Sequence, residues 1–229
     1  MTSRAAPPVL PELPAQTKQA ILVTAVSWAS QTGTLQKCDK IGNVWRATGP
    51  VVRVSLGKGG LAWGEGLHRP NEPQKREGDG KAPAGIFELG PAFGYARNAP
   101  AGCRWPYRAM TEHDYLVDDP ESREYNQLVT LPGDRPNTKS WKSAEKMKRD
   151  DSLYELGLMV RHNFPHVIKN KGSAIFFHIW EKRGAPTVGC TALARKNLLD
   201  LILWLDPERH PLLVQAPVEE IKNMALVHN

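Results

Sequence analysis

Short apolar runs separated by glycine, proline and charged residues recur along the chain and predict a protein built mostly from β-strands. Strands are expected at residues 19–28, 43–46, 51–54, 86–89, 157–160 and 173–180, because β-branched and aromatic runs bounded by turn formers are typical of strands. A turn is expected at residues 32–34. The run at 173–180 (SAIFFHIW) is apolar on both faces, which predicts a central, buried strand.

Apolar residues recur at helical spacing in two segments, residues 140–156 and 195–205. The apolar positions are Ala144, Met147, Leu153 and Leu156 in the first segment and Leu198, Leu199, Ile202 and Leu205 in the second. Asp206 and Pro207 are expected to end the second helix. Together the patterns predict an α+β fold that is mostly β, a sandwich or barrel with a few flanking helices.

The chain has 229 residues, which fits one domain with short extensions. Residues 1–18 contain four prolines and predict a flexible, proline-rich leader. Residues 19–215 are expected to form the folded domain and residues 216–229 a C-terminal tail. Within the domain, residues 57–85 are rich in glycine and charge and residues 95–113 are irregular. The first of these loops is too long for a plain hairpin connection, and such loops often border a functional site.

Composition excludes several classes of protein. Hydrophobic residues make up 41% and charged residues 24% of the chain, which is ordinary for a soluble globular protein. No apolar run is long enough for a membrane-spanning helix, and the first twenty residues lack the apolar core of a signal peptide. The chain is therefore expected to be cytoplasmic, or to have lost its export signal, or to leave the cell by another route.

The net charge of +6 is modest and spread along the chain. The densest basic stretch, residues 139–149, is expected to be a solvated helix face. Because no nucleic-acid-binding module is recognisable, no nucleic-acid partner is expected. The oligomeric state is not predicted by the sequence.

Three cysteines are present: Cys38, Cys103 and Cys190. An odd number leaves at least one thiol unpaired. A disulfide between Cys38 and Cys103 is one hypothesis for an oxidising compartment.

The strongest chemical candidate is a histidine on the central strand followed, twelve residues later, by a cysteine after a glycine. His178 could take the proton of the Cys190 thiol and return it to a leaving amine. Gly189 would allow a tight turn whose main-chain N–H groups stabilise an oxyanion. Spacing alone leaves a second interpretation open, in which Cys190 is a small buried apolar residue and His178 a core histidine.

Other chemistries fit the sequence less well. His162, His166, His178 and Cys190 could in principle bind zinc, but Pro165 prevents a regular helical pair and no CxxC or HExxH spacing is present. The Gly-x-Ser-x-Gly elbow of serine hydrolases is missing, and the glycines of residues 57–66 form no phosphate-binding fingerprint. No metal and no organic cofactor is expected.

Three segments together resemble the L,D-transpeptidase (YkuD-like) catalytic domain. Residues 186–190 (PTVGC) after the strand histidine resemble the family's His…Ser/Thr-x-Gly-Cys signature. Residues 78–87 (GDGKAPAGIF) resemble the Thr-Pro-x-Gly-x-Phe element in the form of one bacterial branch, and residues 118–126 resemble the same branch. The resemblance covers roughly residues 20–206.

The resemblance implies a peptidoglycan-remodelling enzyme. In this family a cysteine attacks the L,D peptide bond after the diamino acid of a tetrapeptide stem and expels D-alanine, and an amine then resolves the acyl-enzyme. Carried over, Cys190 is the nucleophile, His178 the general base and acid, and Thr187 orients the turn or the substrate. Gly189 and the Cys190 N–H belong to the oxyanion hole. The implied partner is a peptidoglycan stem peptide.

The sequence departs from the family pattern at several positions. Thr187-Val188 replaces the usual Ser-His, Ala82 replaces a threonine, Ala192 replaces a frequent arginine, and the His-to-Cys spacing is short. The missing arginine leaves the substrate contact open. Candidate substrate-binding residues are Arg195, Arg161, Arg183, Lys75, Arg76, Lys81 and Trp180. Asp118 and Asp119 could bind an acceptor amine, although Asp-Asp-Pro is also a turn former.

Several functions remain compatible with these motifs. The favoured one is a transpeptidase that cross-links stems or exchanges a D-amino acid. The alternatives are a hydrolase on the same fold (an L,D-carboxypeptidase, or an enzyme that cuts cross-links or anchored lipoprotein), a secreted antibacterial effector, and a wall-binding module with a decayed site. A remodelling enzyme is expected in the periplasm or cell envelope, with its export signal absent from this chain.

Overall fold

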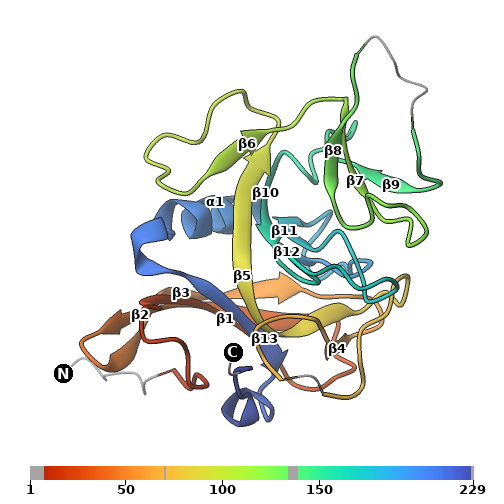
Figure 1. Ribbon diagram of the computed structural model, residues 1–229. Helices are drawn as coiled ribbons and strands as arrows, with labels where there is room; N and C mark the ends of the chain where they lie inside the picture. Colours follow the sequence, from red (N-terminus) through yellow and green to blue (C-terminus); the bar gives the residue numbers. More distant parts are fainter. Residues whose placement is uncertain (1–7, 70, 134–138, 228–229) are drawn as a thin grey trace.

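The computed structural model describes residues 8–69, 71–133 and 139–227, and these are mostly β (Figure 1). The strands are β1 (Gln19–Ala25), β2 (Thr32–Ile41), β3 (Val44–Ser55), β4 (Leu61–Trp63), β5 (Ala82–Gly94), β6 (Tyr107–Ala109), β7 (Asp114–Val117), β8 (Leu128–Thr130), β9 (Ala144–Lys146), β10 (Leu156–Val160), β11 (Phe176–Ile179), β12 (Thr191–Leu193) and β13 (Leu212–Pro217). The helical elements are α1 (Arg195–Trp204) and two 3₁₀ turns, Pro207–Arg209 and Ile221–Asn223. The mostly β fold with few helices is confirmed.

The main sheet has ten strands and closes on itself. Its order is β10-β11-β12-β3-β2-β1-β13-β5-β4, and β10 also pairs with the long strand β5. This extra pairing joins the first strand of the path to β5, so the strands from β10 to β5 close into a barrel and β4 lies beside β5 outside that closed circuit. β6 pairs with β5, and β8-β7-β9 form a separate three-stranded sheet. Figure 1 shows this small sheet beside the barrel, on the side where β10, β11 and β12 lie.

Two apolar clusters hold these layers together. The larger one joins barrel residues such as Ile21, Phe87 and Phe177 to the buried face of α1. The smaller one includes Phe93 and Phe176 on the barrel, Leu116 on β7, and Cys190. Adjacent residues of β11 therefore belong to different clusters, as the alternation of side chains along a strand requires. The smaller cluster packs the three-stranded sheet against the barrel and surrounds the cysteine.

The structure confirms the second predicted helix and corrects the first. The predicted helix at 195–205 is α1, where Leu198, Leu201 and Ile202 are buried. The helix predicted at 140–156 is wrong, because this segment contains β9, which pairs antiparallel with β7, followed by irregular chain. Met147 and Tyr154 are buried in the smaller cluster without any helix. Strand pairing and aromatic packing outweighed a weak helical pattern there.

The strand predictions near Pro50 also needed correction. The segments 43–46 and 51–54 form one long strand, β3, although Gly49 and Pro50 lie between them. The register with β2 shifts between Leu35 and Lys37, and Gln36 Nε2 donates to Thr48 O at 3.0 Å and to Gly49 O at 3.3 Å. Proline lacks an N–H and is tolerated at such a bulge. The turn expected at residues 32–34 is instead the start of β2.

The ends of the chain pack against the barrel. Residues 1–7 of the predicted leader lie outside the described residues, whereas Leu13 is buried in the larger cluster. In the segment predicted as a C-terminal tail, residues 216 and 217 complete β13, Ile221 and Met224 are buried, and residues 228 and 229 lie outside the described residues. All three cysteines are free, so the Cys38–Cys103 disulfide does not form in this structure. None of the helices in the described residues is long and apolar enough to cross a membrane.

Two buried histidines make the fold sensitive to acid. Burial lowers the pKa of His68 to about 4 and that of His162 to about 3, against about 6.5 in an unfolded chain. Between these values the unfolded chain binds protons that the folded protein excludes, so the free energy of unfolding falls as pH drops from about 6.5 towards 4. We expect His68 alone to contribute roughly 3 kcal/mol to this fall.

Urea unfolding at a series of pH values measures this effect. The His68→Asn variant keeps an acceptor for the Ile86 N–H, which donates to His68 Nδ1 at 3.1 Å. It should be less stable at neutral pH but show a shallower slope below pH 6.5. The exposed His166 provides the matched control, because His166→Gln should leave the slope unchanged. An equally steep slope in His68→Asn would contradict the assignment.

Candidate active site

The register of β11 and β12 brings His178 and Cys190 to the same face of the barrel. These strands are parallel, with Phe177 opposite Thr191 and His178 opposite Ala192. Extending this register by one residue towards the N-terminus places Cys190 beside Phe176. Side chains alternate along a strand, so Cys190 lies on the face that carries His178. The Phe176 N–H donates to Cys190 Sγ at 3.4 Å, in agreement with this register.

The thiol of Cys190 is buried and protonated in the resting structure. Its side chain is 5% exposed, and Sγ donates to Ala174 O at 3.4 Å. Burial raises the pKa of Cys190 to about 12, and Glu145 adds to the effect, whereas the Phe176 N–H and Lys75 oppose it. Because the thiolate is the nucleophile, such a thiol needs a base and a positive charge nearby to react at neutral pH.

His178 has the form that a general base requires. Its Nδ1 lies 2.8 Å from Ile179 O, so Nδ1 carries the proton and Nε2 keeps a free lone pair. Burial lowers the pKa of His178, and Arg149 lowers it further, so the imidazole is neutral at pH 7. Tyr154 packs edge-on against the ring with centroids 5.5 Å apart and fixes its plane. The strand predicted to carry a base therefore presents a neutral, oriented imidazole.

The turn before Cys190 is held by the hydroxyl of Thr187. Thr187 Oγ1 donates to Cys190 O at 2.6 Å and accepts from the Gly189 N–H at 3.1 Å. Gly189 has φ +151°, where other residues are strained, and a Cβ there would lie 3.2 Å from Lys81 O. Since the Gly189 N–H is occupied by Thr187, the Cys190 N–H is the better candidate for the oxyanion donor expected from this turn.

A cavity of about 270 Å³ contains both reactive groups. It is lined by Lys58, Lys75, Glu77, Gly78, Gly80, Asp118, Glu145, Tyr154, Ser173, Ala174, Ile175, His178, Val188, Gly189 and Cys190. Its walls carry both signs of charge, with two lysines and three acidic residues. Burial and the neighbouring Asp118 raise the pKa of Glu145, and Asp118 Oδ1 is buried without a hydrogen-bond partner among the described residues. The cavity can therefore receive a ligand that has both a carboxylate and an amine.

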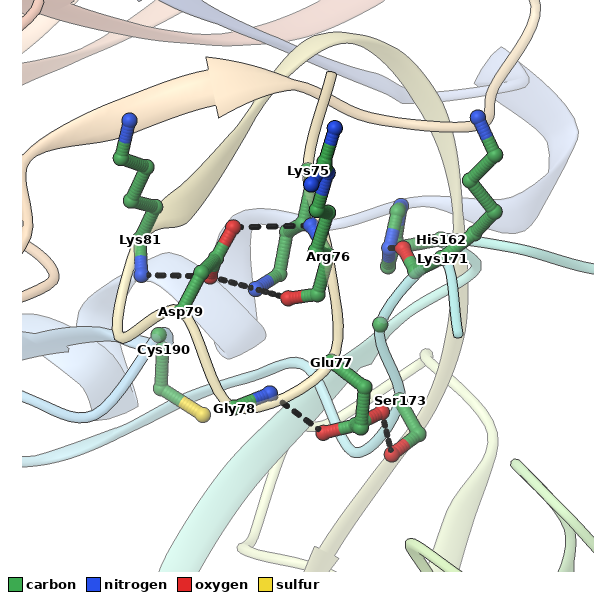
Figure 2. A network of polar contacts seen from close by, with 12 residues as sticks. Lys75, Arg76, Glu77, Gly78, Asp79, Lys81, His162, Lys171, Ser173 and Cys190 are labelled. Atoms are coloured by element: carbon green, nitrogen blue, oxygen red, sulfur yellow. Dashed lines mark hydrogen bonds and ion pairs between the residues drawn. The ribbon is translucent and has the colours of Figure 1, made fainter. Parts of the chain in front are cut away.

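The glycine-rich loop forms one wall and is cross-linked by carboxylates (Figure 2). Asp79 accepts from Lys75 Nζ at 2.7 Å and from the N–H groups of Arg76 at 2.8 Å and Lys81 at 2.9 Å. These donors hold the pKa of Asp79 below its usual value, although burial opposes them. The result is a loop fixed by main-chain as well as side-chain contacts.

Glu77 links this loop to the segment that precedes β11 and contacts Cys190. Its carboxylate accepts from Ser173 Oγ at 2.7 Å and from the Tyr125 hydroxyl. Asn126 Oδ1 accepts from the Ala174 N–H at 3.1 Å, and Ala174 O in turn accepts from the thiol. Tyr125 and Asn126 therefore position the groups around the sulfur and do not line the cavity.

Of the candidate substrate-binding residues, Lys75 lines this cavity, whereas Arg195, Arg161, Lys81 and Trp180 lie outside its wall. Arg195 starts α1 and pairs with Glu155 at 2.8 Å. Arg161 is 3.9 Å from Glu88 and stacks on Phe164. Lys81 contributes its N–H to Asp79, and the Trp180 N–H donates to Leu193 O at 3.1 Å. Their roles towards substrate stay predictions.

Other residues line the cavity that the sequence reasoning did not single out. They are Lys58, Glu77, Glu145, Tyr154 and Ser173. Glu145 and Tyr154 belong to residues 140–156, where the apolar spacing predicts a helix and gives no indication of a site. Of the acidic pair, Asp118 lines the cavity, whereas Asp119 accepts from the N–H groups of Lys142 and Glu121 and caps a turn. Among the described residues, no group of three or more His, Cys, Asp or Glu side chains is arranged to hold a metal.

The Thr187 hydroxyl should matter for turnover more than for folding. Thr187→Val removes both hydrogen bonds to the turn while keeping the shape of the side chain. We expect a loss of about 1 kcal/mol in stability and a 10- to 100-fold slower reaction, roughly the effect of displacing a reacting group by about 1 Å. Urea unfolding and initial rates measure both effects. Thr187→Ser keeps the hydroxyl and should stay near the parent rate; equal rates for serine and valine would reject the role.

The fold and the cavity define a mostly β protein in which a buried thiol and a neutral imidazole share one pocket. The family model of the YkuD L,D-transpeptidase catalytic domain matches residues 29–219, and the chain belongs to this family. No curated protein matches the sequence significantly.

A solved structure, that of Bdellovibrio bacteriovorus Bd1075, is similar to this chain at 13% sequence identity and a TM-score of 0.41. The match covers 92% of this chain and 52% of that chain. The chain thus spans about half the length of the structure it matches.

Proposed function

We propose that the protein is a cysteine-dependent L,D-transpeptidase that acts on peptidoglycan tetrapeptide stems through an acyl-enzyme on Cys190. The observation that carries the proposal is that one cavity is lined by both the buried thiol of Cys190 and the neutral imidazole of His178, whose Nδ1 is held by Ile179 O. The YkuD family supplies the substrate class.

The geometry supports a two-step acyl transfer. His178 Nε2 takes the thiol proton as Cys190 Sγ attacks the carbonyl carbon of the bond that follows the diamino acid. The Cys190 N–H stabilises the resulting oxyanion. The imidazolium then returns the proton to the amine of D-alanine as the C–N bond breaks. An acceptor amine, losing a proton to His178, attacks the thioester and releases Cys190.

The charge of the cavity suits the diamino acid of a stem peptide. That residue carries an amine and, in its diacid form, a carboxylate. Lys58 and Lys75 can receive the carboxylate, and Asp118 and Glu145 can receive the amine. Binding an ammonium would also give the buried Asp118 Oδ1 the partner that it lacks.

Peptidoglycan lies outside the cytoplasmic membrane, so we place the proposed reaction in the periplasm or cell envelope. A secreted effector that reaches the wall of another cell would use the same chemistry. Localisation of the full-length gene product with a fluorescent tag distinguishes these settings from a cytoplasmic one.

The test is mass spectrometry of purified protein incubated with disaccharide-tetrapeptides and a D-amino acid. Cross-linked dimers or D-amino-acid exchange is the expected result. Tripeptide products alone would mean that water resolves the acyl-enzyme, and the hydrolase alternative would replace the proposal. Unchanged tetrapeptides would reject it, and cleavage of cross-linked dimers or anchored lipoprotein would then identify an endopeptidase or amidase.

A further inference from the structure

A buried lysine lies in the wall of the cavity, opposite the turn that carries the cysteine. The side chain of Lys75 is 4% exposed, which is rare for lysine without a partner. Its Nζ donates to Asp79 Oδ1 at 2.7 Å and to Arg76 O at 3.3 Å (Figure 2). An ammonium has three donors, so one N–H remains beyond these two contacts.

The position of this ammonium is fixed relative to the nucleophile. A Cβ built on Gly189 would lie 3.8 Å from Lys75 Nζ, which puts the charge across from the residue next to Cys190. Lys75, Gly189 and Cys190 line the same cavity. Because Asp79 is itself held by two main-chain N–H groups, the ammonium cannot move away from the turn without breaking the loop.

The other groups that face Cys190 do not supply a comparable positive charge. Lys58 is exposed and screened by solvent. His178 is neutral in the resting state. Glu77, Asp118, Glu145 and Tyr154 line the cavity from the remaining elements and either oppose a thiolate or leave it unaffected. Among the residues that line the cavity, Lys75 is therefore the buried side chain that already carries a positive charge before the thiol loses its proton.

We propose that the Lys75 ammonium, held in place by Asp79, is the fixed positive charge that stabilises the thiolate of Cys190. The inference rests on the proposed function, in which this thiolate attacks the stem. In the step concerned, the S–H bond breaks and the proton moves to His178 Nε2, giving a thiolate and an imidazolium. Lys75 keeps its own proton and makes this ion pair more favourable.

The experiment measures the reactivity of Cys190 in the absence of any stem peptide. Alkylation by iodoacetamide is followed from pH 5 to pH 10 by mass spectrometry of the peptide that contains Cys190, which separates it from Cys38 and Cys103. In Lys75→Met we expect the rate to fall about tenfold at every pH in this range. The range lies below the pKa of the Cys190 thiol, where the thiolate content falls tenfold for each unit by which that pKa rises.

Two further variants keep the test decisive. Lys75→Met leaves the Asp79 carboxylate without its cation, which can destabilise the loop. The double variant Lys75→Met/Asp79→Asn removes this unpaired carboxylate. If the double variant regains the stability of the parent, its Cys190 should still be alkylated as slowly as in Lys75→Met. Lys171 is the matched control: it pairs with Glu65 at 3.5 Å and does not line the cavity, so Lys171→Met should alkylate like the parent. A folded Lys75→Met or double variant that alkylates at the parent rate at every pH would overturn the proposal.

The experiment distinguishes a failure of the role proposed for Lys75 from a failure of the proposed transpeptidase reaction. Loss of stability with unchanged alkylation would mean that Lys75 only supports the loop, and this too would overturn the proposal. Slower alkylation in the variants combined with no processing of disaccharide-tetrapeptides by the parent would keep the role of Lys75 and reject the transpeptidase reaction.

Discussion

Replacing Cys190 with alanine should abolish the formation of cross-linked or exchanged products, with a loss of at least about 10⁴-fold in rate. Removing the nucleophile of a catalytic set costs about as much as removing the whole set. In this protein Sγ is the only atom of the proposed mechanism that bonds to the acyl group. Mass spectrometry of the products measures the loss of turnover. Mass spectrometry of the intact protein measures the acyl-enzyme, which adds the mass of the disaccharide-tripeptide less one water.

The fold should tolerate this substitution. Cys190 belongs to the apolar cluster that also contains Phe93, Phe176 and Tyr154, and losing the sulfur leaves a small gap that should cost about 1–2 kcal/mol. Cys190→Ser keeps hydrogen-bonding capacity towards Phe176 N–H and Ala174 O but has a much weaker nucleophile, so it should be folded and nearly inactive. Cys103→Ser should be fully active, because Cys103 lies outside the cavity and contacts Trp105 O. Product formation by Cys190→Ala would reject the nucleophile assignment.

The parts of the fold that were predicted from sequence are those in which one local pattern decides the outcome. The strand at 173–180 and the helix at 195–205 have strong apolar patterns, and both elements form. The segment 140–156 failed because its apolar residues face a cluster contributed by β5, β7 and β11, and contacts so distant along the chain leave no local signal. The pairing of β10 with β5, which closes the barrel, could not be predicted either, because it joins strands that are distant along the chain.

The candidate site divides in the same way. His178, Thr187, Gly189 and Cys190 lie within thirteen residues of one another and form a sequence motif, and the structure brings them together. The charged wall comes from four separate segments. Lys75 and Asp118 were candidates from the sequence, whereas Lys58, Glu77 and Glu145 gave no local signal. Their positive charge made Arg195 and Arg161 candidates to bind the substrate, but each pairs with an acidic residue elsewhere on the surface. The cation on the cysteine side of the cavity is Lys75, because Asp79 in the glycine-rich loop holds its ammonium there.

Replacing His178 should cause the second-largest loss of turnover, after the replacement of Cys190. His178→Gln removes the base while keeping a polar side chain on β11, and we expect turnover to fall by about 10²- to 10⁴-fold. The matched variant is His210→Gln: this residue lies after α1, outside the cavity, and its replacement should leave turnover unchanged. Full turnover in His178→Gln would mean that another group takes the thiol proton.

The pH dependence separates a base from a residue that only shapes the site. Burial and Arg149 lower the pKa of His178 below its ordinary value of 6.5, so the parent enzyme should stay active through pH 6.5 and lose activity at lower pH as the imidazole takes up a proton. In His178→Gln the remaining slow reaction should lack this acidic fall and instead rise with pH, following the ionisation of Cys190. Rates of D-alanine release between pH 4.5 and 9 test this, with circular dichroism at each pH to check that the protein is folded. If the variant kept the acidic fall of the parent, the titrating group would be another residue, because glutamine has no proton to gain in this range.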